Sequence, residues 1–282
     1  MVLSSSAQGA IEYLLIIGAA IIVVAVVIVA ITSVSFSSKN QLASAGASHT
    51  IDPLKETSGI YFRIRNYYYR KSGLGNGLVG LWHFDEGGGT ITNDSSGNGN
   101  NGTLSSNLAW AGGKFGGALF PNGLYSVSCG DSSSLNFSSN KITIGAWVYL
   151  NTLAPQYSVI AAQRSGCGDF SWQFYGDVSD KLYFGIKGTD NLLLECSSDN
   201  SPALNQWEYV VASYDGAQIV LYKNGVPIKT CPGSKIMKSV SGGIKIGDES
   251  CNHPYAGSID EVAIWNRALS ASEIQSLYTN SQ

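Results

Sequence analysis

Residues 206–228 read QWEYVVASYDGAQIVLYKNGVPI, and this stretch decides the fold class. Its apolar runs are rich in β-branched and aromatic residues, which is typical of β-strands. Asn224 and Gly225 stand between two such runs. An Asn-Gly pair in this position is a strong signal for a two-residue hairpin, because both turn positions need a positive φ. The stretch therefore predicts antiparallel strands connected by tight turns.

The same pattern extends in both directions, from Leu78 to near the C-terminus. Runs such as KITIGAWVYL (141–150) alternate, so that successive side chains face opposite sides of a sheet. About thirteen short strands separated by Gly, Asn, Asp and Ser indicate an all-β sandwich. The tail LSASEIQSLYTN (269–280) instead has helical spacing, with Ser270 or Ser272 as its N-cap.

The N-terminal region has a different character. Residues 8–31 read QGAIEYLLIIGAAIIVVAVVIVAI, and the nineteen residues from Tyr13 to Ile31 carry no charge. A helix of this length nearly spans the hydrocarbon core of a bilayer. An ordinary secretory signal has a basic start and a cleavage site after its apolar core. Here no basic residue comes first, and the small-residue junction between Ala7 and Gln8 precedes the core.

Gln8, Glu12 and the run IEYLL resemble the class III signal peptide of archaeal type IV pilin-like proteins. The resemblance implies cleavage between Ala7 and Gln8 by a prepilin peptidase, and packing of the remaining helix with other pilin-like subunits in a filament. A buried carboxylate needs a partner, and the freed amine of Gln8 in a neighbouring subunit could supply it for Glu12. Ser6 and Ala7 depart from the pattern, since many such signals have a basic residue and Gly there. A plain membrane anchor is the alternative.

Composition sets further limits. The chain has 282 residues and a net charge of -3, and no basic tract indicates nucleic-acid binding. About 250 residues follow the apolar helix, which is enough for one large β domain. The expected organisation is a leader (1–7), a hydrophobic pilin-like or transmembrane helix (8–32), a helix continuation and linker (33–75) and a β domain (76–282).

Several stretches of the β domain together resemble one family. They are GLVGLWHFDEGGGT (77–90), NDSSGNGNNGTL (93–104), GKFGGALF (113–120), ITIGAWVYL (142–150) and GSIDEVAIWNRALSASEIQSLY (257–278). The domain is similar to the LamG-like jellyroll family, within the concanavalin A-like lectin/glucanase superfamily. The resemblance implies two curved antiparallel sheets packed face to face, with the first and last strands paired. It does not fix function, because this fold carries lectins, adhesion modules and hydrolases alike.

Four carboxylates, those of Asp85, Glu86, Asp260 and Glu261, are candidates for a glycosidase pair, which needs two carboxylates at a set separation. The glucanases of the superfamily place theirs in a Glu-x-Asp-x-(x-)Glu run, and no Glu here has an Asp two positions later. Adjacent residues such as Asp260 and Glu261 should face opposite sides of a strand. We therefore predict no catalytic residues and no enzyme activity, with a membrane-anchored surface glycoside hydrolase as the alternative.

The loop DSSGNGN (94–100) is rich in oxygen ligands. Asp94, Asn98 and Asn100 suit a hard cation such as Ca²⁺, which takes six to eight oxygens. The strand pairing that the resemblance implies would bring Asp260, together with Asp85, toward this loop. A structural calcium ion is therefore the one cofactor expected. The alternative is an Asx-rich turn that needs no metal.

A second calcium candidate comes from the resemblance, because pentraxin relatives bind calcium through loops equivalent to 164–169 and 248–254. Asp169, Asp248 and Glu249 could act there. The favoured alternative is a disulfide between Cys167 and Cys251, which would join the same loops. Cys196 and Cys231 would then form the second disulfide and Cys129 a buried free thiol, although sequence alone leaves the connectivity open.

Aromatic residues offer a further hypothesis. Tyr157, Trp172, Tyr175 and Tyr183 lie on expected strands that could share a concave face and stack on sugars. Aromatic residues on sandwich strands are more often part of the core. The sequence assigns no ligand-binding residue.

These observations predict a surface-displayed pilin-like subunit whose LamG-like domain mediates adhesion or glycan binding. The protein would lie in the cell membrane before assembly and on an extracellular filament or the cell surface afterwards. Its expected partners are other pilin-like subunits, the membrane, a prepilin peptidase and a glycan or other surface ligand. A purely structural subunit whose sandwich coats the filament is a further alternative.

Overall fold

A computed structural model of the chain describes residue 69 and residues 73–281, except for 106–108, 122–125, 138, 153–156, 178–180, 201, 249–250 and 252. The expected leader junction at Ala7 and Gln8, the Glu12 carboxylate and the helix expected over 8–32 lie outside the described residues. Most of the linker expected over 33–75 also lies outside them. Within the described part of the chain, no helix combines the length and hydropathy needed to cross a membrane.

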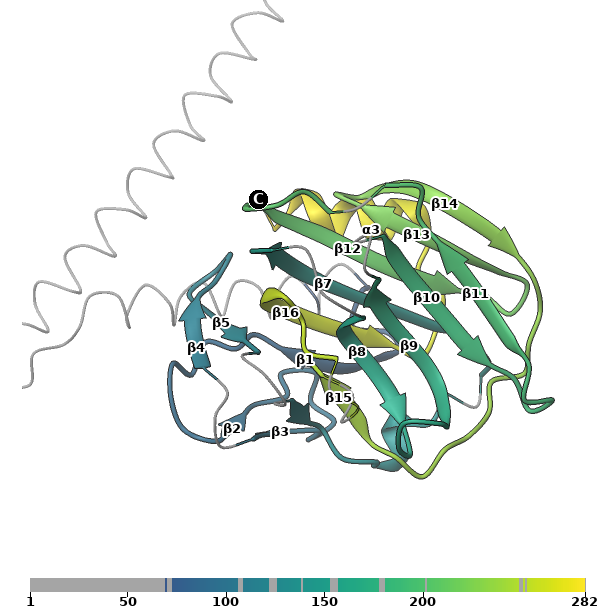
Figure 1. Cartoon of the computed structure of the whole chain (residues 1–282), viewed down its shortest axis with the longest axis horizontal. Helices are drawn as coiled ribbons and strands as arrows, with labels where there is room; N and C mark the ends of the chain where they lie inside the picture. The colour runs from purple at the N-terminus through teal and green to yellow at the C-terminus, as the bar shows by residue number, and fades with distance from the viewer. Residues whose placement is uncertain are drawn as a thin grey trace, which may run out of the picture. The chain divides into compact units, whose positions relative to one another are not determined.

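Two antiparallel sheets build the fold, which confirms the predicted all-β sandwich (Figure 1). Sheet A has the order β14 (Val226–Pro232), β13 (Gln218–Lys223), β12 (Trp207–Tyr214), β7 (Ile142–Leu150), β16 (Gly257–Trp265), β5 (Gly117–Phe120) and β4 (Ala109–Gly112). In the same sheet β1 (Leu78–Trp82) pairs with β16, so the expected pairing of the first and last strands is confirmed.

Sheet B also has eight strands. Its order is β11 (Leu193–Ser197), β10 (Leu182–Lys187), β9 (Phe170–Gly176), β8 (Ser158–Arg164), β15 (Ile244–Ile246), β6 (Val127–Ser128), β3 (Gly102–Leu104) and β2 (Ile91–Thr92). A short 3₁₀ helix, η1 (Ser133–Leu135), precedes β7, and the helix α3 (Ala271–Thr279) follows β16.

The Asn-Gly pair connects β13 to β14, as predicted. Asn224 has a φ of 51° and Gly225 a φ of 77°, so both turn residues are left-handed. The Asn224 side-chain oxygen also accepts a hydrogen bond of 2.9 Å from the backbone N–H of Tyr209 on β12. The turn therefore fixes the β13–β14 register and ties the hairpin to its neighbouring strand.

Strand alternation divides the apolar residues into an inner core and an outer cluster. The inward side chains of both sheets, such as Trp172, Phe184 and Ile144, form the core of the sandwich. On sheet A the outward residues form a second cluster, which includes Trp147 and Trp265 and packs against Ile274 and Leu277 of α3. Ser270, the first of the two expected caps, forms a capping box with Glu273 at the start of α3.

The N-terminal side of the domain also contributes to the outer cluster. Leu74 is buried, and its carbonyl oxygen accepts a hydrogen bond of 2.7 Å from the Trp265 indole N–H. The Tyr69 ring lies 6.2 Å from the Trp265 ring. Packing therefore extends to the N-terminal side of Gly75, where the domain boundary is expected.

Two disulfides join distant parts of the chain. Cys196 on β11 of sheet B is bonded to Cys231 on β14 of sheet A, and Cys167 is bonded to Cys251. These are the two pairs that the sequence analysis favoured. Cys129 is a buried free cysteine, and its burial, together with the negative charge of Asp94, raises the pKa of its thiol.

Candidate functional site

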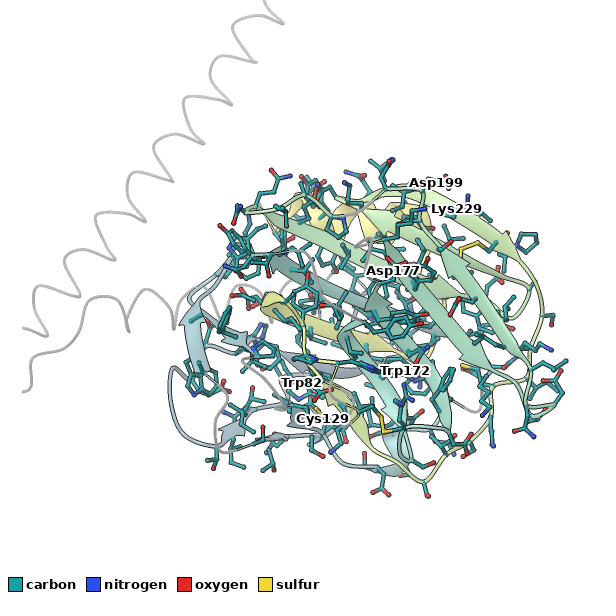
Figure 2. The ribbon with its side chains drawn as sticks, in the orientation of Figure 1. Trp82, Cys129, Trp172, Asp177, Asp199 and Lys229 are labelled. Atoms are coloured by element: carbon teal, nitrogen blue, oxygen red, sulfur yellow. A yellow bond between two sulfur atoms is a disulfide. The ribbon has the colours of Figure 1, made fainter. Side chains whose placement is uncertain are left out.

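The outer face of sheet B carries a row of tyrosines. Trp172, labelled in Figure 2, and Phe174 on the same strand belong to the core of the sandwich. Tyr175 follows Phe174 directly, so the strand alternation points it outward, where it clusters with Val159 and Ala162. Its ring stacks on that of Tyr183 at a centroid distance of 5.2 Å and an interplanar angle of 14°. Tyr157 is 52% exposed and lies edge-on to Tyr175 at 5.4 Å. Three of the four expected aromatic residues thus share one outer face, and Trp172 belongs to the core.

A pocket of about 390 Å³, called the tyrosine pocket below, opens beside these tyrosines on the outer face of sheet B, called the tyrosine face. Its walls come from β8, β9 and β11 and from the loops at both ends of the disulfide between Cys167 and Cys251. The residues that line it are Tyr157, Val159, Arg164, Cys167, Phe170, Gln173, Tyr175, Leu193, Glu195 and His253. It combines an aromatic wall with a carboxylate, an amide and a guanidinium group.

A glycine leaves room between the polar side chains of this face. In the strand registers Gly185 on β10 lies opposite both Gln173 on β9 and Glu195 on β11. A Cβ atom at Gly185 would lie 3.4 Å from the Glu195 Oε1 atom and 3.3 Å from a methyl group of Leu193. A larger side chain would therefore occupy the space between three residues that line the pocket.

Arg164 organises the charged side of the pocket. Its guanidinium group donates hydrogen bonds to the Gln173 Oε1 atom at 2.9 Å, to the carbonyl oxygen of Gly166 at 3.2 Å and to that of Cys167. The same group lies 5.3 Å from the centre of the Phe170 ring. These contacts hold the loop that follows β8 in place, and the disulfide from Cys167 connects it to the loop that carries His253.

The tyrosine hydroxyls are held by carboxylates. Tyr175 donates a hydrogen bond of 2.7 Å to Glu195, and Tyr183 donates one of 3.0 Å to Asp177. Burial and, secondly, the Glu195 hydrogen bond raise the pKa of Tyr175, and burial followed by the Asp177 hydrogen bond raises that of Tyr183. Both rings therefore stay neutral at physiological pH, with their orientations fixed.

Sequence reasoning identified the tyrosines but missed the polar half of this pocket. Gln173 lies two residues before Tyr175, so the alternation of β9 would have placed both on one face. Glu195 and Arg164 carry no comparable local signal, because their positions depend on how β8 and β11 align with β9 and β10.

The acidic residues at the β1–β16 junction form a different arrangement. His83 Nδ1 lies 2.9 Å from both carboxylate oxygens of Glu261. The regular alternation expected for Asp260 and Glu261 does not hold, because a β-bulge interrupts the strand there and Glu261 has a φ of 51°. Both residues are buried. Asp260 accepts hydrogen bonds from the backbone N–H groups of Phe115 at 3.0 Å and Glu261 at 2.7 Å.

Asp85 and Glu86 also bind nearby backbone. Asp85 accepts a hydrogen bond of 2.9 Å from the N–H of Gly117, and Glu86 accepts one of 2.7 Å from the N–H of Asn93. Together with His83 they line a small pocket of about 190 Å³. Each of the four acidic residues that sequence reasoning considered for catalysis thus has a contact that positions a loop or a strand.

The expected calcium loop is held together by hydrogen bonds. Asp94 accepts four: from the N–H groups of Leu81, Ser96 and Asn100, at 3.0, 2.8 and 2.9 Å, and from the Ser96 hydroxyl at 2.8 Å. The side-chain amide of Asn98 donates to the carbonyl oxygen of Leu78 at 3.0 Å. The Asn100 side-chain amide donates at 2.7 Å to the carbonyl oxygen of Val79, which also lies on β1.

The Asp94 oxygens therefore accept hydrogen bonds from one hydroxyl and three backbone N–H groups, as in an Asx-rich turn. Within the described ranges, no group of three or more His, Cys, Asp or Glu residues could hold a metal ion. Asp169 forms ion pairs with Lys187 and Lys238, and Asp248 accepts a hydrogen bond from the N–H of His253. Glu249 lies outside the described residues. Calcium binding stays a prediction.

Solved structures share this fold at low sequence identity. The binding domain of Paraclostridial Mosquitocidal Protein 1 has a TM-score of 0.57 and 18% identity, covering 73% of this chain and 53% of its own. Domain 4 of AbnA, a GH43 extracellular arabinanase from Geobacillus stearothermophilus, was solved with arabinotriose. It has a TM-score of 0.56 and 21% identity over 71% of this chain and 98% of its own. The botulinum neurotoxin serotype G binding domain has a TM-score of 0.55 and 17% identity, covering 72% and 51%.

The chain thus spans about half the length of the two toxin structures and nearly all of the arabinanase domain. No curated protein sequence matches it. The family model of the Concanavalin A-like lectin/glucanases superfamily matches residues 125–275, which is more than half of the chain. This protein therefore belongs to the Concanavalin A-like lectin/glucanases superfamily.

Proposed function

We propose that this protein binds glycans in the pocket beside Tyr157, on the outer face of sheet B. The observation that carries the proposal is the exposed Tyr157 ring beside the Gln173 and Glu195 side chains. An aromatic face packs against the apolar C–H face of a sugar ring, while a few placed polar groups hydrogen-bond its hydroxyls. The pocket offers both kinds of contact within one sugar-sized hollow.

Three features favour an uncharged glycan. Lys187, whose ammonium group lies 5.8 Å from the centre of the Phe170 ring in the pocket wall, pairs with Asp169. The Arg164 guanidinium is occupied by Gln173 and by the loop that follows β8. The one carboxylate in the wall, that of Glu195, accepts hydrogen bonds but repels anions. The arabinotriose complex of the arabinanase domain supports this proposal through the shared fold.

The proposal extends to where the domain is displayed. The apolar run over residues 8–31, with Gln8 and Glu12 at its start, supports a pilin-like subunit that presents the domain for adhesion. Mass spectrometry of the native protein tests this part. An N-terminus at Gln8 is the expected result, and an N-terminus at Met1 or after Ile31 would contradict it.

The Glu12 carboxylate tests filament assembly separately. Glu12→Ala should leave the protein in the membrane but impair its incorporation into filaments, because a buried partner for the terminal amine is lost. Normal incorporation of this variant would favour a plain membrane anchor.

We further propose binding without turnover, since the acidic residues at the β1–β16 junction each have a contact that positions backbone or His83. The protein should retain a neutral polysaccharide on a glycan array and release no reducing ends from it. Cleavage that survives repurification and is abolished by Glu261→Gln or Asp85→Asn would show that the protein is a hydrolase.

The matched variants for the array are Tyr157→Ala and Tyr149→Ala. Tyr149 lies on sheet A and packs on Trp207 at 5.5 Å, so it offers a partly exposed aromatic ring outside the pocket. Tyr157→Ala should weaken retention about tenfold, which corresponds to about 1.4 kcal/mol. Equal retention by wild type and Tyr157→Ala would refute this binding site, and no retained glycan at all would favour the structural-coat alternative.

A further inference from the structure

A second pocket lies on the other side of the β8–β9 ribbon from the tyrosine face. It has a volume of about 350 Å³ and is bordered by the η1 region and the segment 236–241. Its floor includes the apolar side chains of Leu135, Phe137 and Met237, all of them buried. Serines at positions 132, 133, 239 and 241 also line it, together with Asp131 and Lys238, and Lys238 is paired with Asp169.

Two buried polar side chains line this pocket, and each has an atom without a hydrogen-bond partner among the described residues. Gln163 is 7% exposed, and its amide nitrogen donates a hydrogen bond of 3.1 Å to the carbonyl oxygen of Leu135. Its amide oxygen has no hydrogen bond among the described residues. Ser171 is 3% exposed, and its hydroxyl likewise has none there. Neither atom is among the fully buried side-chain atoms that lack a partner in the described part of the chain, so both face the pocket, where a ligand can pair with them.

This pocket is distinct from the first. Gln163 and Arg164 are consecutive on β8, so their side chains point to opposite faces. Gln163 reaches Leu135, whereas Arg164 reaches Gln173 in the tyrosine pocket. Phe170 and Ser171 divide in the same way between the two pockets.

We propose that this pocket is a second binding site, which takes one sugar ring or a similar small uncharged polyol. An acceptor at Gln163, a hydroxyl at Ser171 and the serines of the lining match a ligand with several hydroxyl groups. The apolar floor matches the C–H face of such a ring. The volume falls within the usual range of small-molecule pockets, about 300–1,000 Å³. The domain would then hold a glycan at two places, which raises avidity for a branched or repeating chain.

Methionine provides a local probe. The chain has two methionines, Met1 and Met237, and Met237 lies in the floor of this pocket. Full-length protein labelled with [methyl-¹³C]methionine is titrated with D-glucose, D-galactose and L-arabinose, and Met237→Leu identifies the Met237 signal. At least one of the three sugars should move that signal saturably, both in wild type and in Tyr157→Ala.

Ser171→Ala separates ligand contact from folding. Ser171→Ala should weaken the affinity for the sugar at least fivefold. The melting temperature should stay unchanged, because the Ser171 hydroxyl has no partner to lose among the described residues. Ser213→Ala is the control, since Ser213 is a buried serine of sheet A, 3.0 Å from the Thr143 hydroxyl. It should leave the affinity unchanged.

Any of three results would overturn the proposal. The first is a Met237 signal that none of the three sugars moves. The second is an unchanged affinity in both Ser171→Ala and Ser171→Leu, which fills the pocket. The third is a response that disappears in Tyr157→Ala, because the signal would then report the tyrosine pocket.

Discussion

The outer faces of the two sheets have similar residues and different surroundings. On sheet A, Trp147, Tyr209 and Trp265 are buried in a cluster that the helix α3 completes. On sheet B, Tyr157, Tyr175 and Tyr183 form an aromatic row beside an open pocket. The same strand alternation produces both rows, so the covering helix determines which one is core and which one can receive a ligand.

The largest difference should appear in stability. Trp265→Ala on the covered face removes a fully buried side chain and its hydrogen bond to Leu74. We expect a loss of about 3–5 kcal/mol in the free energy of unfolding. Tyr157→Ala on the open face should cost at most about 1 kcal/mol, because its ring is half exposed. Denaturant unfolding of both variants measures this, and similar losses would contradict the comparison.

The two disulfides should differ in their effect on glycan binding. Replacing Cys196 and Cys231 by Ala should cost about 2–4 kcal/mol and leave the affinity of the folded protein unchanged, since this bond joins the two sheets. Replacing Cys167 and Cys251 should also weaken glycan binding, because Cys167 and His253 both line the tyrosine pocket. Calorimetry of both double variants tests this. Unchanged affinity without the Cys167–Cys251 bond would show that it does not shape the pocket.

The hydrogen bonds of the loop 94–100 indicate a structural role, whereas its oxygen-rich composition predicts calcium binding. Asp94→Ala should destabilise the protein by about 2–3 kcal/mol, because it leaves backbone N–H groups without their acceptor. Melting with and without chelator separates the two roles. Bound calcium predicts that chelator lowers the melting temperature of wild type but not of Asp94→Ala, and equal melting of wild type in both conditions would reject a structural calcium.

Sequence predicted local features well. The Asn224-Gly225 hairpin, the Ser270 cap and the strand alternation depend on neighbouring residues, and the structure has all three. It could not assign the aromatic residues to faces, because burial of Trp147 depends on a helix more than a hundred residues later in the chain. The β-bulge at Glu261 was also not predicted, since it arises from pairing with strands far away in the sequence.

The pocket itself can be filled without disturbing the core. Gly185→Val places two methyl groups between Gln173 and Glu195 on the open face. We expect about tenfold weaker glycan binding and little change in stability. Gly176→Val in the next strand is the comparison, since the nearest atom to a Cβ there lies 3.7 Å away. Unchanged binding by Gly185→Val would place the ligand elsewhere.

The smallest effect concerns the helix that covers sheet A. Hydrogen bonds from Arg267, followed by those of the Ser270 cap, lower the pKa of Glu273 to about 2 from its usual value of 4.5. The stabilisation is therefore complete above pH 4.5 and is lost as the pH falls toward 2. The free energy of unfolding of wild type should exceed that of Glu273→Gln by about 0.5–1 kcal/mol at neutral pH. Denaturant unfolding of both proteins from pH 7 to pH 2 measures this difference. A difference that stays constant down to pH 2 would contradict the lowered pKa of Glu273.

A structure of the protein with the glycan that it retains most strongly is the most direct test of glycan binding beside Tyr157 on the outer face of sheet B. We expect a sugar ring against the Tyr157 side chain, with its hydroxyls hydrogen-bonded to Gln173 and Glu195. A glycan bound on the sheet A face, or at the loop 94–100 with the Tyr157 pocket empty, would contradict it.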